Sequence, residues 1–346
     1  MIPLTFESPQ TLAEAQASLA DADAMALAGG TTVVDLMKLN LATPSRVVSI
    51  RPRLDPSVAF DGDELRIGAG CTMSAAASSD ALRENAPALR QSLITAASPQ
   101  IRNMATLGGN LLQRTRFPYF RHLDMDVGGP DPKAANDALP FGSGADTGLA
   151  AVLGHGGRLV GTYPGDFAVA FVAFDGTVDL SGPDGERSVP AREFYREPVE
   201  GEIQYKTVLK PGELITALRV PASGMLRNSF YMKVRERSSY AFALASAAIG
   251  LRMDGDTIAE ARVGLGGLGS IPWHSPEAEQ ALTGRPATDE TFAAAAAAAL
   301  DGAEPPAGVE FKVPLAKRTI VRALQTLRDE GVLSDRRLWA MQHGRG

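Results

Sequence analysis

The sequence predicts an α+β protein of two domains, and three observations support that expectation. The chain has 346 residues, a length that suits about two domains of ordinary size. Its composition, 45% hydrophobic and 21% charged, is that of a globular chain. After Pro221 the pattern becomes three strands followed by three helices, an order typical of helices packed on an antiparallel sheet. We therefore expect domains at 1–222 and 223–330 and a tail at 331–346.

The first domain is predicted to open with a helix. Thr11 and Glu14 have the spacing of a capping box, which favours a helix running to about Leu19. Residues 24–38 are predicted to form a short apolar strand, a glycine-rich turn and a helix. The next expected elements are strands at 46–50 and 64–73, with Cys71 buried in the second, a helical stretch at 75–97, and a second strand with glycines at 104–113.

A long stretch at 114–148 differs from its surroundings. It is rich in Pro, Gly and Asp and has no clear period, which predicts a long loop inserted between core elements. Beyond it we expect a buried helix at 166–176, a hairpin at 177–189 that turns at 183–185, and a strand at 213–220.

The second domain is predicted from strand periods and turn residues. The expected strands are 230–238, 242–254 and 261–267, and the expected helices are about 275–283, 288–301 and 314–330. The tail is basic and carries Trp339, so we expect it either to contact a partner or to fray.

Bulk properties exclude several classes of function. A net charge of −6 and a pI of about 5.4 argue against nucleic acid or an anionic membrane as the main partner. One cysteine rules out an internal disulfide and a cluster or zinc site built on cysteines of this chain. The four histidines are scattered without metal-binding spacing. No basic and apolar leader or membrane-length apolar run occurs, so we expect a cytoplasmic protein without a membrane span.

Two glycine pairs are the first candidate sites. One lies in Ala28-Gly29-Gly30-Thr31-Thr32, and the other lies in Thr106-Leu107-Gly108-Gly109-Asn110. Glycines let a backbone approach a ligand, and successive N–H groups can hold a pyrophosphate. Each pair alone is equally typical of an ordinary tight turn. Together they favour one long diphosphate ligand that contacts both, although neither fits the G-x-G-x-x-G fingerprint of a Rossmann domain.

Asp166 and Lys233 are the other candidates. Asp166 precedes the expected apolar helix, where a carboxylate serves either as a helix cap or as an acceptor for ligand hydroxyls. Alternation along the strand puts Tyr231, Lys233 and Arg235 on one face. That face is either solvated, or it carries an ammonium near a flavin, where negative charge develops on reduction.

Five segments in order resemble the FAD subunits of the xanthine dehydrogenase/aldehyde oxidase family, most closely those of bacterial three-subunit aldehyde oxidoreductases. They are AGGTTVVDLMK, QIRNMATLGGNLLQRTR, TYPGDFAVAFVAFDG, LKPGELITALRVP and FYMKVRERSSYAFALASAA, and the likeness spans about residues 3–330. The resemblance implies a vanillyl-alcohol-oxidase-type (PCMH-like) FAD-binding domain followed by a carbon monoxide dehydrogenase flavoprotein-type C-terminal domain.

The resemblance also implies which residues bind FAD. The diphosphate would be wrapped by the first segment and contacted by the second, Asp166 would bind hydroxyls, Ile215 would line a pocket, and Lys233 would lie near the isoalloxazine. Ala96 stands where relatives can have an aromatic ring. The full set is Leu27, Ala28, Gly29, Gly30, Thr31, Thr32, Val33, Val34, Thr106, Leu107, Gly108, Gly109, Asn110, Asp166, Ile215 and Lys233.

The chain departs from the similar aldehyde oxidoreductase subunits in one respect. Those subunits carry an extra iron–sulfur cluster in the loop that corresponds to 114–160. Here Phe117 takes the place of the first ligand, Arg158-Leu159-Val160 lies near the last, and the loop has no cysteine. We therefore predict no iron–sulfur cluster in this chain and a loop held by packing alone.

The function that the resemblance implies is electron transfer. A large partner would hold the molybdenum cofactor and oxidise an aldehyde or N-heterocycle, and a small partner would pass electrons from two [2Fe-2S] clusters to FAD in this chain. An external acceptor would then take them. The alternatives are a stand-alone FAD oxidase, with His155 or Tyr240 as its base, and a docking subunit with little FAD. Export with a partner would make the location periplasmic.

Overall fold

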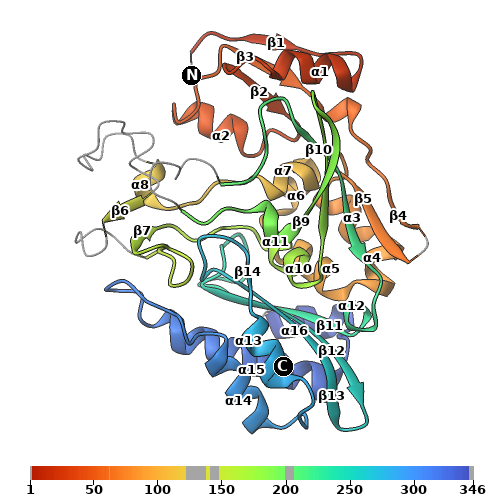
Figure 1. The fold of residues 1–346 in the computed structure, drawn as a ribbon, viewed down its shortest axis with the longest axis vertical. Helices are drawn as coiled ribbons and strands as arrows, with labels where there is room; N and C mark the ends of the chain where they lie inside the picture. Colours follow the sequence, from red (N-terminus) through yellow and green to blue (C-terminus); the bar gives the residue numbers. More distant parts are fainter. Residues whose placement is uncertain (1, 62, 122–137, 141–147, 199–205, 343–346) are drawn as a thin grey trace.

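The computed structural model describes residues 2–61, 63–121, 138–140, 148–198 and 206–342 (Figure 1). The strands in this part of the chain form four sheets, with orders β1-β3-β2, β4-β5-β10-β8-β9, β11-β12-β13-β14 and β6-β7. We call the described residues up to 228 the first half and those from 229 the second half. Helices and strands are mixed in both halves, and the longest antiparallel pairing joins β12 to β13.

The first sheet is small and parallel. Its strands are β1 (Thr5–Glu7), β3 (Arg46–Ser49) and β2 (Ala24–Leu27), with α1 (Leu12–Leu19) and α2 (Val33–Lys38) between them in sequence. As predicted, Thr11 caps α1, and its hydroxyl accepts the Glu14 N–H at 3.1 Å. The Glu14 carboxylate accepts the N–H of Gln10, the residue before the cap, at 2.8 Å, so it reaches back one residue further than in a standard capping box.

The second sheet is antiparallel and has five strands. They are β4 (Val58–Asp61), β5 (Glu64–Gly68), β10 (Leu214–Pro221), β8 (Thr177–Gly182) and β9 (Gly185–Pro190). The predicted hairpin is confirmed, because Gly182 pairs with Gly185 across the turn. The register of β10 against β8 shifts between Ile215 and Ala217, which marks a bulge in β10.

Short helices make up much of the rest of the first half, and α7 contacts β5 and β10 of this sheet. Every residue of α10 is buried, which confirms the predicted apolar helix. The helices and the 3-10 turn are η1 (Arg51–Arg53), α3 (Met73–Ser78), α4 (Asp80–Asn85), α5 (Pro87–Thr95), α6 (Pro99–Met104), α7 (Leu107–Leu111), α8 (Pro118–Arg121), α10 (Phe167–Ala173), α11 (Ala191–Phe194) and α12 (Gly224–Arg227).

The second half confirms the predicted order of strands followed by helices. β11 (Ser229–Val234), β12 (Ala245–Asp254) and β13 (Thr257–Gly266) are followed by the short strand β14 (Trp273–His274). Three helices then follow, namely α13 (Pro276–Leu282), α14 (Asp289–Ala298) and α15 (Lys312–Glu330). They lie on one side of this sheet in Figure 1.

The tail forms a further helix, α16 (Asp335–Gln342). Leu338 of α16 is buried, and Asp335 forms an ion pair with Arg90 of α5. The described part of the tail therefore packs on its own chain, while residues 343–346 lie outside the described residues.

Three predictions were wrong in detail. Residues 104–113 are not a strand, because only 105–108 run alongside 69–73 and α7 already begins at Leu107. Cys71 is buried but follows β5 instead of lying in it. The stretch at 75–97 forms three short helices, since Ser79 and Pro87 each start a new one.

The inserted segment and the strand after it contribute to the hydrophobic core of the second half. Phe117, Phe120 and Leu159 pack in the same cluster as the apolar residues of β12, β13 and α15. β6 (Ala138–Pro140) of the segment pairs with β7 (Arg158–Val160), which lies beyond it. Just after the segment, the Lys312 ammonium of α15 donates to the carbonyl oxygens of Ala150 at 2.9 Å and of Gly267, which follows β13, at 3.1 Å. Burial lowers the pKa of Lys312 to about 8.

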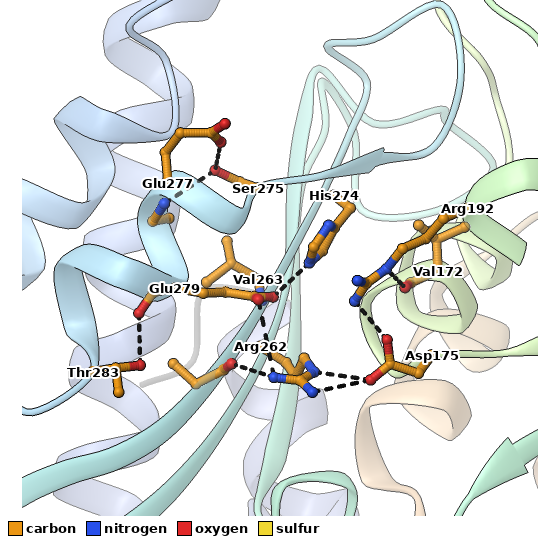
Figure 2. A network of polar contacts seen from close by, with 12 residues as sticks. Val172, Asp175, Arg192, Arg262, Val263, His274, Ser275, Glu277, Glu279 and Thr283 are labelled. Carbon is orange, nitrogen blue, oxygen red and sulfur yellow. Dashed lines mark hydrogen bonds and ion pairs between the residues drawn. The ribbon is translucent and has the colours of Figure 1, made fainter. Parts of the chain in front are cut away.

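A polar network joins the two halves elsewhere (Figure 2). Asp175, which follows α10, accepts from Arg192 at 2.7 Å and from Arg262 of β13 at 3.1 Å. Glu279 of α13 accepts the N–H of Val263 at 2.9 Å and lies 2.8 Å from His274 Nε2. This network fixes α10 against the sheet of the second half. In the part of the chain that the structure describes, no helix combines the length and apolar character needed to cross a membrane.

Candidate functional site

The two glycine segments lie against each other. Residues 28–32 connect β2 to α2, and residues 105–108 comprise the connection from α6 and the first residues of α7. A side chain on Gly29 would overlap the main-chain carbonyl of Met104, so the two backbones are in direct contact. Segments that lie 75 residues apart in sequence are therefore adjacent in the fold, as the hypothesis of one shared ligand requires.

Glycine is required at positions 29 and 30 for two different physical reasons. Gly30 has φ +75°, a left-handed conformation that L side chains rarely adopt. Gly29 is required because the neighbouring protein backbone is so close. The sequence interpretation gave both glycines to a ligand, but the structure shows that Gly29 first serves the packing of the two segments.

Two adjoining cavities lie along these segments. A cavity of about 170 Å³ is lined by residues 28–33, Thr106, Gly108 and Ile215 among others. A larger cavity of about 550 Å³ is lined by Ala96, Asn110, Asp166 and the loop at 236–244. Both are lined by Thr31, Thr32 and Gly109, so they meet between the two glycine segments. We refer to them together as the cleft.

Most of the predicted site residues line the cleft. Four do not line either cavity, namely Leu27, Val34, Leu107 and Lys233. The remaining twelve are Ala28, Gly29, Gly30, Thr31, Thr32, Val33, Thr106, Gly108, Gly109, Asn110, Asp166 and Ile215.

One buried acceptor is free to meet a ligand. The side-chain oxygen Oδ1 of Asn110 is buried and has no hydrogen-bond partner within the described residues. Its amide nitrogen makes only a long contact, 3.5 Å, to the sulfur of Met73. A buried amide oxygen without a partner costs free energy unless a donor reaches it. The residues of the cleft therefore fit a ligand with polar donors at this point.

Asp166 and Lys233 form a buried ion pair. Their side chains are 5% and 2% exposed, and Lys233 Nζ lies 2.7 Å from Asp166 Oδ2. The Tyr231 hydroxyl donates to Asp166 Oδ1 at 2.7 Å. Burial, and next the charge of Asp166, raises the pKa of Tyr231 well above its ordinary value. The Asp166 side chain makes no cap hydrogen bond with α10. Its carboxylate is held in place by Tyr231 and Lys233 of β11 instead.

The face formed by Tyr231 and Lys233 of β11 and by Arg235, which follows it, packs against protein. Tyr231 and Lys233 reach Asp166, and Arg235 donates to the carbonyl oxygen of Thr95 at 2.9 Å. The alternation predicted for this strand is correct, but the face packs against the first half of the molecule.

Sequence reasoning missed much of the rim of the larger cavity. The loop between β11 and β12 supplies Arg237 and Phe242, which were missed, beside Tyr240, which was named only as a base of the alternative oxidase, and the start of the inserted segment supplies Arg116. Tyr240 has φ +53° and a 55% exposed side chain, and its carbonyl accepts from Arg237. Arg116 lies over the ring of Phe242, 5.4 Å from its centroid. Only the unusual conformation of Tyr240 marks this loop, and that is invisible in sequence.

The two candidate bases of the alternative oxidase are placed differently. Tyr240 lines the larger cavity, whereas His155 lines neither cavity and approaches the carbonyl oxygen of Glu304 at 3.1 Å. His122 and His343 lie outside the described residues. In the described part of the chain, no group of three or more His, Cys, Asp or Glu side chains is arranged to hold a metal ion.

The described ends of the inserted segment are held by ion pairs as well as by packing. Asp35 of α2 accepts from Arg116 at 2.9 Å and from Arg121 at 2.7 Å. The expectation of packing alone was therefore wrong for these residues. Phe117, which stands where the similar subunits have a cluster ligand, is fully buried. Cys71, the single cysteine of the sequence, is also buried, and burial raises its pKa to about 11.

Comparison with known proteins places the chain in a family. Residues 3–223 match the FAD binding domain in molybdopterin dehydrogenase, and residues 230–327 match the CO dehydrogenase flavoprotein C-terminal domain. The chain belongs to the family of molybdopterin dehydrogenase FAD-binding domains. The match confirms the predicted family, and it confirms the α+β fold in which an FAD-binding domain precedes a flavoprotein C-terminal domain.

Several members of this family are similar over nearly their whole length. The aldehyde oxidoreductase FAD-binding subunit PaoB of Escherichia coli strain K12 is 38% identical, over 95% of this chain and 99% of that protein. The carbon monoxide dehydrogenase medium chain of Afipia carboxidovorans is 29% identical, over 94% and 97%. A chain of the Cu,Mo-CO dehydrogenase crystal structure superposes with a TM-score of 0.72 at 28% identity, over 94% of this chain and 98% of that chain.

Proposed function

We propose that this chain is the FAD-carrying electron-transfer subunit of a molybdenum hydroxylase that oxidises an aldehyde or an N-heterocycle. The observation that carries the proposal is the cleft, which both glycine segments line and which continues past Asp166. Its two adjoining cavities suit an elongated ligand such as a dinucleotide. The cytoplasm is the expected compartment, and export with a partner subunit would make it the periplasm.

The smaller cavity would hold the diphosphate and one end of FAD. Backbone N–H groups of residues 28–33 would supply donors for phosphate oxygens, and the hydroxyls of Thr31 and Thr32 would add to them. The N–H groups of Leu107, Gly108 and Gly109 already donate within the chain, so the second segment would contribute close backbone approach instead. Ile215, at the bulge of β10, would line the apolar part of the pocket. Leu27, Val34 and Leu107 would support these segments from behind.

The larger cavity would hold the flavin end. Asn110 Oδ1 would accept a donor from the cofactor, and Asp166 would accept hydroxyl groups while Lys233 and Tyr231 fix its orientation. The cofactor supplies the electron chemistry, and the protein supplies binding, orientation and a fixed electrostatic environment. No side chain of this chain is assigned a proton-transfer role towards the organic substrate.

The partners follow from the same proposal. A large subunit would bind the molybdenum cofactor and the organic substrate, and a small subunit would hold two [2Fe-2S] clusters. This chain would contribute no cluster, because its one cysteine, Cys71, is buried in the core of the FAD-binding half. Relatives named for aldehyde and carbon monoxide oxidation support the proposal.

A visible spectrum and a binding titration test the proposal. The full chain should bind about one FAD and should oxidise no aldehyde by itself. Thr32 lines both cavities and makes no cap hydrogen bond, so Thr32→Trp should fill their junction without loss of a cap. FAD affinity should fall by at least about tenfold. Thr283→Trp, at an exposed position, is the matched control.

Two results would reject the proposal. A chain that stays colourless after incubation with FAD would indicate a docking subunit. Turnover of an organic substrate by the isolated chain would indicate a stand-alone oxidase.

A further inference from the structure

Three cationic side chains converge on the C-terminal end of α5. The carbonyl oxygen of Thr95 accepts from Lys233 Nζ at 3.3 Å and from Arg235 Nη1 at 2.9 Å. Arg102 Nη1 donates to the carbonyl oxygens of Ala96 at 2.7 Å and Ala97 at 3.3 Å. We call Arg102, Lys233 and Arg235 the cation cap, because together they bind the last carbonyl groups of this helix.

The cation cap lies directly behind the wall of the larger cavity. Ala96 and Ala97 line that cavity, while none of the three cationic residues does. The Ala97 backbone has φ +45°, and two of the three capped carbonyl groups belong to the lining residues themselves. The charges are therefore separated from the cavity by the main chain of residues 96–97.

The charges of the cation cap do not cancel. Lys233 is paired with Asp166, but Arg102 and Arg235 have no ion pair with a carboxylate in the described part of the chain. Burial, and then the charge of Arg235, lowers the pKa of Arg102. Burial also lowers the pKa of Arg235, and Asp166 acts in the opposite direction. Two like charges held together in a half-buried place favour an anion nearby.

A bare helix end would have the opposite effect. The C-terminus of a helix carries a partial negative charge from its unpaired carbonyl groups. Without the cap, the wall at residues 96–97 would oppose the gain of negative charge in the cavity. With the cap, those carbonyl groups are bound and the local charge behind the wall is positive.

We propose that Arg102 and Arg235, acting through the end of α5, make this wall positive and so favour the reduced over the oxidised form of FAD in the cleft. This inference rests on the proposed function, because it requires FAD in the larger cavity. The sequence assigned that electrostatic role to Lys233, whose charge is balanced by Asp166. Arg102 and Arg235 are positioning residues in this account, since they act through the helix end.

The test measures the midpoint potential of FAD bound to the full chain. Arg102→Gln and Arg235→Gln keep a hydrogen-bond donor but remove the charge. Each should lower the ratio of reduced to oxidised FAD at a fixed applied potential by about tenfold, the order expected for a unit charge across one protein layer. Affinity for oxidised FAD should change by less than about threefold. Arg102→Lys and Arg235→Lys should stay near the wild-type potential.

Arg252→Gln is the matched control. Arg252 pairs with Glu260 on the exposed part of β12 and β13, and its loss should leave the potential unchanged. The two arginine positions test the inference independently, and thermal unfolding checks that each variant is folded.

Each other outcome overturns the inference. A potential unchanged in both Gln variants, with FAD bound, would overturn it and leave the proposed function intact. A shift of equal size in the Lys variants would show that shape, not charge, is responsible. A wild-type chain that binds no FAD would overturn the proposed function together with this inference.

Discussion

At the scale of single residues, the buried ion pair of Asp166 and Lys233 should have a large effect on stability. Both side chains are nearly inaccessible, so removal of one charge leaves the other without compensation. Lys233→Met should therefore destabilise the chain by about 3–5 kcal/mol in urea unfolding. Asp166→Asn combined with Lys233→Met should cost less than Lys233→Met alone, because no unpaired charge remains buried. A cost below about 1 kcal/mol for Lys233→Met would show that water reaches the pair.

At the scale of elements, the start of the inserted segment depends on α2. Asp35 binds Arg116 and Arg121, and these arginines outweigh burial, so the pKa of Asp35 lies below its ordinary value. A carboxyl pKa that is lower in the folded state stabilises at pH values above the unfolded pKa, and the effect is lost as the pH falls through the folded pKa. Asp35→Asn should hence speed cleavage by trypsin after Arg116 and Arg121 at neutral pH. Its effect on unfolding free energy should shrink below about pH 4.

The control for this element is Asp80→Asn. Asp80 pairs with Arg83 on an exposed helix surface, so its loss should leave trypsin cleavage after Arg116 and Arg121 unchanged. Equal cleavage in the wild type and the Asp35 variant would mean that buried Phe117 and Phe120 alone hold the segment.

At the scale of the whole molecule, the network around Asp175 couples the two halves (Figure 2). Arg262 bridges Asp175 of the first half and Glu279 of the second, whereas Arg192 binds Asp175 from the same half. Arg262→Met should separate or broaden the calorimetric unfolding transition, because it removes a link between halves. Arg192→Met, which removes a similar contact with the same carboxylate, should lower the Tm slightly and leave one transition. Identical traces for the two variants would contradict this role of the network.

Much of the fold could be predicted where the decisive forces are local. The hairpin at 183–185, the apolar helix at 167–173 and the three helices after β14 follow from turn residues and from the period of apolar side chains. Thr11 as the cap of α1 follows from residue spacing alone. The segment around Gly108 and Gly109 was misassigned, because Thr106 starts a helix only after the chain has paired with residues 69–73.

Part of the site could be predicted for the same reason. The glycine segments and Asp166 stand at the ends of locally recognisable elements, and all of them border the cleft. Arg102, Arg116 and Phe242 could not be found, and Arg235 was placed only on the face of Lys233, because their positions depend on contacts between elements far apart in sequence. An arginine on a helix surface and an arginine that binds the end of a neighbouring helix look the same in sequence.

The sequence by itself determined the family, the α+β class, the order of most elements, and the absence of cysteine ligands from the inserted segment. Only the tertiary structure decided that the two glycine segments touch, that Lys233 is neutralised by Asp166, and that two further arginines bind the end of α5. The physical reason is that periodicity, capping and turn chemistry act over a few residues. Burial and Coulomb interactions depend on three-dimensional distance, which no single segment specifies.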